Sequence, residues 1–277
     1  MISIHLKEII QEALKEDIGM GDLTSGSIFS SEHKSKGTFI AKSEGIVAGL
    51  EALTNAYNIL GDDVEVVLHK KDGDKVLKKD VVATVEGSTR VLLSAERVIL
   101  NIVQHLSGIA TSTSEVINLL NDESITVTDT RKTLPGLRAL QKYAVLCGGG
   151  KNHRFRLDDG VMIKDNHIKA AGSITKAVER VRSNIGHMVK IEVETESKDQ
   201  VLEAVDANVD VIMLDNRTPA EIKELAKVIP DNITVEVSGG ITPETINNFR
   251  GCGADVISLG WLTHSVKALD ISFNLNN

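Results

Sequence analysis

Ten basic side chains are crowded into residues 129–168, which read DTRKTLPGLRALQKYAVLCGGGKNHRFRLDDGVMIKDNHI. The whole chain of 277 residues carries a formal net charge of -8. Because like charges repel, a cationic segment in an acidic protein is costly to assemble, and a bound anion would offset that cost. The basic residues are Arg131, Lys132, Arg138, Lys142, Lys151, His153, Arg154, Arg156, Lys164 and His167. The segment predicts a site for a multiply charged anion, against the ordinary alternative of a solvated basic face.

Glycines and apolar runs separate these charges, and this interleaving favours a cleft over a solvated face. The glycines stand at 148–150, and the apolar runs at 144–146 and 160–163. Charges beside core segments usually point into a cleft, where several cationic groups can hold one small molecule at once.

Short motifs of the same kind continue in order along almost the whole chain. They are EDIGxGDxT at 16–24, ERV at 96–98, SGIAT at 107–111, DTRKT at 129–133, NHR at 152–154, IKDNH at 163–167, EVE at 192–194, LDN at 214–216, SGG at 238–240 and SLG at 258–260. Each string alone is weak evidence, but the ordered set is highly specific. In this set the chain resembles the quinolinate phosphoribosyltransferases, also called carboxylating nicotinate-nucleotide pyrophosphorylases.

The second half of the chain alternates short apolar runs with helical segments, as in a series of βα units. Six runs each end at a polar residue or a glycine: 125–129, 161–164, 189–194, 211–215, 234–238 and 256–260. Parallel strands with functional residues at their C-terminal ends are typical of an α/β barrel, and a full barrel has eight strands. We therefore predict an α/β protein with an incomplete parallel α/β barrel over residues 111–277.

The first part of the chain has a different pattern. Residues 4–18 have apolar side chains at helical spacing, and residues 37–93 indicate short strands and turns around a helix at 50–60. Residues 94–120 indicate one long helix, or two joined near Ser107-Gly108. The resemblance implies an N-terminal α/β sandwich domain over residues 1–110, to which the C-terminal tail could return.

The residues that end the six runs would converge at one mouth of the barrel. They are Asp129-Thr130-Arg131, Lys164, Glu194, Asp215, Ser238 and Gly260. A strand-end lysine such as Lys164 could be a salt-bridged surface residue, a Schiff-base lysine of the aldolase kind, or a cation that binds ligand oxygens. The resemblance implies the last role, with Lys132, Lys164, Glu194 and Asp215 as the catalytic residues.

The resemblance also implies which residues bind which part of the substrates. Arg131, Lys132, His153 and Arg154 would hold a pyridine dicarboxylate, because planar guanidinium forks suit carboxylates, and Thr130 would also bind substrate.

Other residues would serve the phosphoribosyl side. Glu194 and Asp215 would contact ribose hydroxyls and a Mg²⁺-bound pyrophosphate, although an ion pair with a nearby lysine is the alternative. Backbone amides at Ser238, Gly239, Gly240 and Gly260 would meet a phosphate.

Three basic residues and one distant arginine complete the candidates. Arg138 and Lys142 stand at i and i+4 on a helix and either reach a ligand phosphate or form a solvated face, and the role of His167 stays open. The resemblance implies a homodimer in which Arg97 of one subunit reaches the pyridine carboxylate bound by the other.

Composition narrows the class of protein. Cys147 and Cys252 are too few for a disulfide framework, residues 1–11 lack the apolar core of a signal peptide, and no run approaches a membrane span. We therefore expect a cytoplasmic protein, and the acidic balance disfavours nucleic acid as a partner.

The resemblance predicts transfer of a phosphoribosyl group from phosphoribosyl pyrophosphate, with Mg²⁺, to quinolinate, with decarboxylation. Two alternatives are a paralogue with another acceptor and a non-catalytic phosphosugar-binding barrel.

Overall fold

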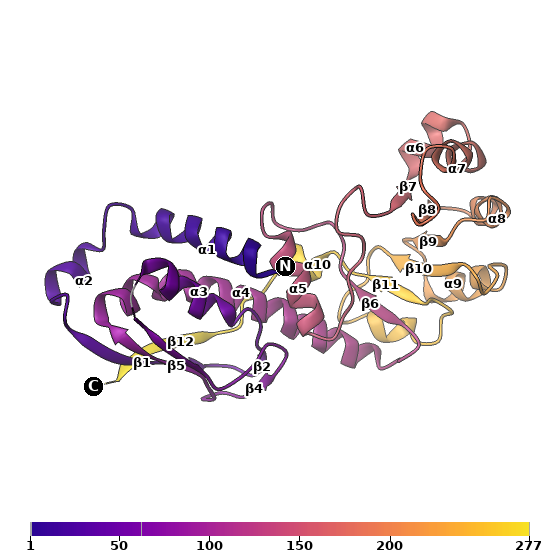
Figure 1. Cartoon of the computed structure of the whole chain (residues 1–277). Coiled ribbons are helices and arrows are strands. Elements are labelled where there is room, and N and C mark those ends of the chain that lie inside the picture. The colour runs from indigo at the N-terminus through magenta and orange to yellow at the C-terminus, as the bar shows by residue number, and fades with distance from the viewer. Residues whose placement is uncertain (1, 62, 277) are drawn as a thin grey trace. The chain divides into compact units, whose positions relative to one another are not determined.

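A computed structural model describes residues 2–61 and 63–276, and the chain folds into two compact units (Figure 1). The first unit comprises the chain up to Ser114, Thr133–Gly149 and the chain from Trp261. The second comprises Glu115–Lys132 and Gly150–Gly260. The expected domains were consecutive segments divided at residue 110, with a C-terminal tail that could return to the first. In the structure the tail lies in the first unit, and residues 133–149 join it, since they carry a helix whose apolar side chains belong to its core.

An antiparallel sheet forms the centre of the first unit. Its strand order is β12-β1-β5-β3, with bounds Ile271–Asn276, Lys34–Ala41, Val81–Ser88 and Glu65–Leu68. The C-terminal strand thus pairs with the first strand of the chain, and Phe39 lies opposite Phe273 with ring centroids 4.7 Å apart. The short strands β2 (Gly45–Ile46) and β4 (Lys75–Val76) pair separately.

Helices supply the rest of the first unit. They are α1 (Ile2–Ile18), α2 (Leu23–Ile28), α3 (Glu51–Leu60), α5 (Arg138–Cys147), α10 (Trp261–His264) and the first part of α4 (Thr89–Leu120). The tract expected as one helix or two is the single helix α4. Gly108 does not break it, and a Cβ there would lie 2.3 Å from the carbonyl oxygen of Lys267. The close approach of that backbone explains the glycine.

A parallel sheet forms the centre of the second unit, in the order β6-β11-β10-β9-β8-β7. In chain order from β6 to β11 the strands are Thr126–Thr128, Val161–Ile163, Ile191–Thr195, Val211–Asp215, Thr234–Ser238 and Val256–Ser258. All six expected runs are strands. Within the described residues no pairing joins β6 to β7, so the sheet stays open at that seam. The predicted α/β fold with an incomplete parallel barrel is confirmed.

Helices follow these strands as βα units require. They are α6 (Asp165–Ala171), α7 (Ile174–Arg182), α8 (Lys198–Asp206), α9 (Pro219–Ala226) and the 3-10 turn η1 (Ile246–Phe249). Ser173, Ser197 and Thr218 cap α7, α8 and α9, each accepting a hydrogen bond from a backbone N–H of the first turn. In Figure 1 these three helices lie along one face of strands β7 to β10.

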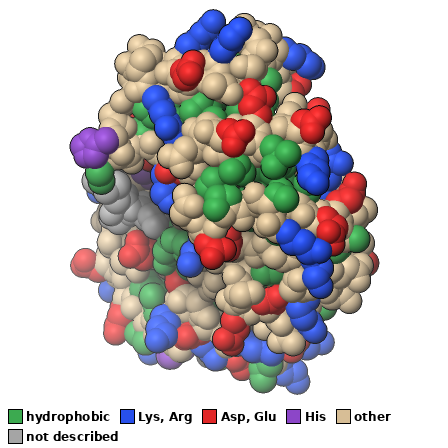
Figure 2. Space-filling model, turned by 90° about the vertical axis from the view of Figure 1, so that its right-hand side faces the viewer, with side chains coloured by type: hydrophobic (Ala, Val, Ile, Leu, Met, Phe, Trp, Pro, Cys, Tyr) green, Lys and Arg blue, Asp and Glu red, His purple; other side chains and the backbone are tan. Residues whose placement is uncertain are grey.

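The surface carries both signs of charge. Figure 2 shows lysines and arginines interspersed with acidic side chains over the face in view. None of the described helices has the length and apolar character needed to cross a bilayer.

Candidate active site

A cavity of about 400 Å³ opens at the C-terminal ends of the parallel strands, and it lies entirely within the second unit. Its size is in the usual range for a small-molecule site. It is lined by Thr130, Arg131, Lys132, His153, Arg154, Met162, Lys164, Glu194, Met213, Asp215, Glu236, Ser238 and Ser258. Nine of the thirteen residues expected at the site are therefore brought together in one pocket.

Strand alternation places these side chains. Successive residues of a strand point to opposite faces, so residues two apart face the same side. The cavity accordingly takes a pair of residues from each of three strands or strand ends: Met162 with Lys164, Met213 with Asp215, and Glu236 with Ser238. Expectations that considered only the strand ends missed the first member of each pair. The period-2 alternation of the same strands would have found them.

One wall of the pocket carries an ion pair beside a second carboxylate. Lys164, directly after β7, pairs its Nζ with Glu194 Oε2 on the neighbouring strand β8. Asp215 ends β9, and its pKa is raised by burial and by the charge of Glu194, against opposing effects of Lys164 and Lys132. Lys164, Glu194 and Asp215 thus form one cluster in which acidic and basic side chains are neighbours.

The segment after β6 supplies cations to the pocket. Thr130 Oγ1 accepts a hydrogen bond from the backbone N–H of Lys132 at 2.9 Å, which shapes the turn. Arg131 is half-buried, and its Nε is buried with no hydrogen-bond partner among the described residues. A buried guanidinium N–H without an acceptor is costly, and an anion in the pocket would supply the acceptor.

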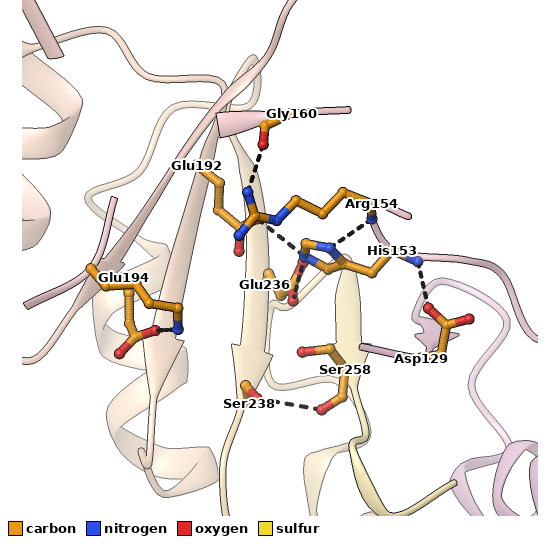
Figure 3. Close-up of polar contacts among 10 residues, drawn as sticks. Asp129, His153, Arg154, Gly160, Glu192, Glu194, Glu236, Ser238 and Ser258 are labelled. Atoms are coloured by element: carbon orange, nitrogen blue, oxygen red, sulfur yellow. Dashed lines mark hydrogen bonds and ion pairs between the residues drawn. The ribbon is translucent and has the colours of Figure 1, made fainter. Parts of the chain in front are cut away.

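A second cluster lies deeper in the second unit and joins His153 to two buried acids (Figure 3). His153 Nε2 is 3.1 Å from Glu192 Oε2 and 3.4 Å from Glu236 Oε1. Burial is the largest influence and lowers the pKa of His153, but together the two carboxylates raise it to about 10. Burial and the nearby Glu236 also raise the pKa of Glu192. Neither acid was expected to have a role.

Backbone and side chain fix this cluster to the surrounding chain. Asp129, at the end of β6, is fully buried and accepts hydrogen bonds from the His153 backbone N–H at 3.0 Å and from Asn152 Nδ2 at 2.6 Å. Arg154 Nη1 donates to the carbonyl oxygen of Gly160 at 2.7 Å. Burial and the neighbouring Arg131 lower the pKa of Arg154, whereas Glu192 raises it.

Four expected residues do not line the cavity. Gly239 and Gly240 directly follow β10, Gly260 follows β11 after one residue, and Arg97 is exposed on α4 in the first unit. Gly239 has a φ of +92°, and a Cβ there would lie 2.2 Å from Asn216 Oδ1. The glycine is therefore required by the turn itself.

The three residues whose role stayed open have structural contacts. Arg138 Nε donates to Thr133 Oγ1 at 2.9 Å, and His167 Nδ1 accepts from the backbone N–H of Lys164 at 3.0 Å, at the start of α6. Lys142 is completely buried in the first unit, so the solvated face considered for it is wrong.

Comparison with known proteins decides the family. The model "Quinolinate phosphoribosyl transferase, N-terminal domain" matches residues 22–107, and the corresponding C-terminal domain model matches residues 109–274. The chain belongs to the quinolinate phosphoribosyltransferase family.

Individual relatives agree with this assignment along nearly the whole chain. "Probable nicotinate-nucleotide pyrophosphorylase (carboxylating)" of Bacillus subtilis is 52% identical, over 99% of this chain and 95% of the relative. "Quinolinate phosphoribosyltransferase (decarboxylating) 2, mitochondrial" of Nicotiana glauca is 40% identical, over 98% and 82%. The crystal structure of NadC from Streptococcus pyogenes matches with a TM-score of 0.96 and 41% identity, over 99% of this chain and 97% of that one.

Proposed function

We propose that this chain transfers the 5-phosphoribosyl group of phosphoribosyl pyrophosphate to quinolinate, with loss of CO₂. The products are nicotinate mononucleotide, pyrophosphate and CO₂, and the reaction belongs to de novo NAD biosynthesis. Membership of the quinolinate phosphoribosyltransferase family carries this proposal, together with relatives whose names state the carboxylating pyrophosphorylase or decarboxylating transferase activity. The two ends of the cavity support it chemically.

The arginine end of the cavity suits the acceptor. Quinolinate presents two carboxylates on adjacent ring carbons, and Arg131 and Arg154 offer planar guanidinium forks to them. The Nε of Arg131, which has no partner among the described residues, supports such a role. Lys132 and Thr130 stand on the same segment and would complete the contacts.

The acidic end suits the donor. When the ring nitrogen attacks C1 of the ribose, the bond to pyrophosphate breaks and positive charge develops on the ribosyl carbon. The carboxylates of Glu194 and Asp215 would stabilise that charge, while Lys164 and Lys132 would stabilise the charge of the leaving group. The backbone amides around Ser238, Gly239, Gly240 and Gly260 would meet the 5-phosphate.

Decarboxylation needs no additional protein nucleophile. A quaternary ring nitrogen stabilises the electron pair left on the adjacent carbon when the 2-carboxylate departs as CO₂, and that carbon then takes a proton. The work of the protein is to position the two substrates.

Magnesium would accompany the donor. Mg²⁺ is usually held by one or two carboxylates together with substrate phosphates. Glu194 and Asp215 fit that donor set, because they are close enough for one charge to raise the pKa of the other. The ion would neutralise charge on the departing pyrophosphate.

We further propose a homodimer in which Arg97 reaches the partner's acceptor site, and a cytoplasmic location. An arginine exposed on α4 is available for such a contact, and two free cysteines suit a reducing compartment. Neither nucleic acid nor membrane is an expected partner.

Release of labelled CO₂ from quinolinate labelled in its 2-carboxylate tests the function. We expect release only with both phosphoribosyl pyrophosphate and Mg²⁺ present. Transfer to another pyridine without CO₂ release would favour a paralogue with another acceptor. Binding of a phosphosugar without any transfer would favour a non-catalytic barrel.

A further inference from the structure

Asn216, the residue directly after β9, has a left-handed backbone conformation. Its φ is +52°, whereas Asp215 before it ends a regular strand. Side chains other than glycine rarely adopt such a φ, and asparagine is among the few that tolerate it. A backbone of this kind persists where surrounding contacts fix it, so the contacts of Asn216 show what the conformation achieves.

The side chain of Asn216 holds a pocket carboxylate. Its Nδ2 donates a hydrogen bond to Asp215 Oδ2 at 2.6 Å. Asp215 is half-buried and lines the cavity, and its Oδ1 accepts no hydrogen bond from the residues that the structure describes. One oxygen of the carboxylate is thus bound by the protein, and the other is left for a ligand.

Asn216 also contacts the turn that follows the next strand. Its backbone N–H donates to the carbonyl oxygen of Ser238, the last residue of β10, at 2.9 Å. Its side chain lies against Gly239 so closely that a Cβ there would be 2.2 Å from Asn216 Oδ1. One residue therefore joins the carboxylate that ends β9 to the glycine turn that follows β10.

The two groups that Asn216 joins would bind opposite ends of one molecule. Asp215 would act at C1 of the ribose and at the magnesium-bound pyrophosphate, and the backbone amides of residues 238–240 would bind the 5-phosphate. Because a ribose ring has a nearly fixed length, both groups can act on it together only at one spacing.

We propose that Asn216 is a positioning residue, which holds the Asp215 carboxylate and the turn at residues 238–240 at the spacing that a phosphoribosyl group requires. It acts through these two groups and touches neither substrate. The inference rests on the proposed function and adds a residue to the donor side of the pocket. Among glycine, aspartate and asparagine, the short residues that tolerate this backbone, only asparagine has a side-chain N–H to donate.

Asn216→Gly removes the amide while the backbone can keep its conformation without strain. A hydrogen bond to the charged form of a carboxyl group stabilises that form, so its loss should raise the pKa of Asp215 by about one pH unit in the ligand-free protein. NMR titration of the carboxyl carbons of isotope-labelled aspartate measures this pKa, and Asp215→Asn identifies the signal. Other charged groups face this carboxylate and are the same in both proteins: Glu194, Glu196, Lys164 and Lys132.

Asn208→Gly is the matched control. Asn208 has a φ of +53°, is exposed and belongs to the turn before β9, at the opposite end of the same strand. Its backbone carbonyl accepts a hydrogen bond from Arg182, which the substitution keeps. We expect the pKa of Asp215 to stay as in the wild type. An unchanged pKa of Asp215 in Asn216→Gly would overturn the inference.

Binding of phosphoribosyl pyrophosphate tests the consequence for the donor. The whole protein is titrated by calorimetry with phosphoribosyl pyrophosphate and Mg²⁺ in the presence of phthalate, which has the two carboxylates of quinolinate but no ring nitrogen to accept the phosphoribosyl group. We expect Asn216→Gly to raise the Kd about tenfold, the size of one hydrogen bond to a charged group, and to change the Kd for quinolinate by less than about threefold. Asn208→Gly should leave both constants unchanged.

The outcomes separate the inference from the proposed function. A wild type that binds no phosphoribosyl pyrophosphate would overturn the proposed function and this inference with it. A wild type that binds it, combined with an Asn216→Gly variant that binds it equally well, would overturn the inference alone. A loss confined to quinolinate would also overturn the inference, because it would place Asn216 on the acceptor side.

Asn216→Asp keeps the shape and the backbone tolerance but replaces the donor by a second carboxylate. Near neutral pH the new side chain cannot donate to Asp215 Oδ2 and repels it, so the Kd for phosphoribosyl pyrophosphate should rise. As pH falls toward about 5, the two carboxylates share a proton, and the new O–H takes over the hydrogen bond. The ratio of the variant Kd to the wild-type Kd at the same pH should therefore shrink toward acid pH. A ratio that does not depend on pH would contradict a role through Asp215.

Discussion

The ammonium group of Lys164 is ion-paired with the carboxylate of Glu194 on the neighbouring strand. The lysine side chain is 44% exposed and that of the glutamate 15%, so the pair sits at the mouth of the cavity with the lysine outermost. Asp215 lies on the next strand, where the charge of Glu194 raises its pKa and the charge of Lys164 lowers it. A substrate that enters here meets charges already balanced against each other, and binding must exchange partners within the cluster.

Lys164→Ala should reduce kcat/KM by at least about a hundredfold with little loss of stability. The ammonium serves ligands at an exposed mouth, and such partly exposed ion pairs contribute only about 0–1 kcal/mol to folding. Turnover and thermal unfolding of the same preparation measure both. Lys169→Ala, which removes an exposed lysine of α6, is the control. Destabilisation by several kcal/mol with turnover intact at low temperature would contradict the assignment.

Lys164→Arg should also be poor, because a compact ammonium and a wide planar fork do not fill the same space. The Schiff-base alternative requires a neutral amine, whereas this lysine is paired with a carboxylate. Borohydride should therefore trap no substrate on the protein. A borohydride-stable adduct at Lys164 would revive the aldolase-like hypothesis.

Glu194→Gln and Asp215→Asn should impair the phosphoribosyl side more than quinolinate binding. Both acids belong to the cluster around Lys164. Their negative charges would stabilise the positive charge that develops on the ribosyl carbon. We expect kcat to fall about a hundredfold or more, while the Kd for quinolinate changes by less than about threefold. The reverse pattern, with weakened quinolinate binding and unchanged affinity for phosphoribosyl pyrophosphate, would exchange the two ends of the pocket.

The sequence predicted the strands of the second unit well, because each is a short apolar run with a polar or glycine end, and such runs are locally encoded. It predicted Lys164, Glu194 and Asp215 at the cavity for the same reason. It did not predict a role for Glu192 or Glu236 beside His153. An acid inside an apolar run looks like an ordinary interruption until the fold places His153, from a loop far away in sequence, against it.

The return of the C-terminal tail to the first unit was expected, but the place of residues 133–149 in that unit could not be predicted from the sequence, for a related reason. Helix α5 carries Arg138 and Lys142 at i and i+4, a spacing that a solvated face could explain, yet Lys142 is fully buried. Which side of an amphipathic helix is covered depends on tertiary partners, and neither periodicity nor charge reports them.

Gly239→Ala should destabilise the turn after β10 and lower activity. The residue has a φ of +92°, and its new Cβ would meet Asn216 Oδ1 at 2.2 Å. Asn216 donates from Nδ2 to Asp215 Oδ2 at 2.6 Å, so the collision should disturb a pocket carboxylate. We expect a loss on the order of 1–3 kcal/mol in the free energy of unfolding, together with reduced kcat/KM.

Gly186→Ala is the matched control for that substitution, since no atom of the described residues lies within 4 Å of a Cβ at Gly186. Adding Asn216→Gly to Gly239→Ala removes the side chain that clashes with the new Cβ, so part of the free energy of unfolding should be recovered. No recovery in the double variant would attribute the whole effect to backbone strain at residue 239.

His153 should make the stability of the protein fall as the solution becomes alkaline. Its pKa is raised from the usual 6.5 to about 10 in the folded state, so the folded protein binds more protons than the unfolded chain between those values. The stabilisation is complete below pH 6.5 and is lost as pH rises through about 10. The difference in Tm between wild type and His153→Gln should therefore shrink between neutral and strongly alkaline pH. A difference that stays constant or grows would contradict the raised pKa.

Arg97 provides the test of the proposed homodimer. It lies in the first unit and is exposed on α4, while the cavity lies wholly in the second unit. If Arg97 acts in trans, Arg97→Ala and Lys164→Ala are each inactive as homodimers, because every site lacks one residue. In a mixed dimer one site carries both lesions and the other carries neither, so half of the sites are complete.

We expect purified mixed dimers, separated by two different tags, to regain about half of the wild-type turnover per dimer. Mixed dimers of Arg97→Ala with wild type calibrate that value. If mixed dimers of the two mutants stay inactive although each mutant folds and dimerises, Arg97 acts within its own subunit or has no role in the reaction.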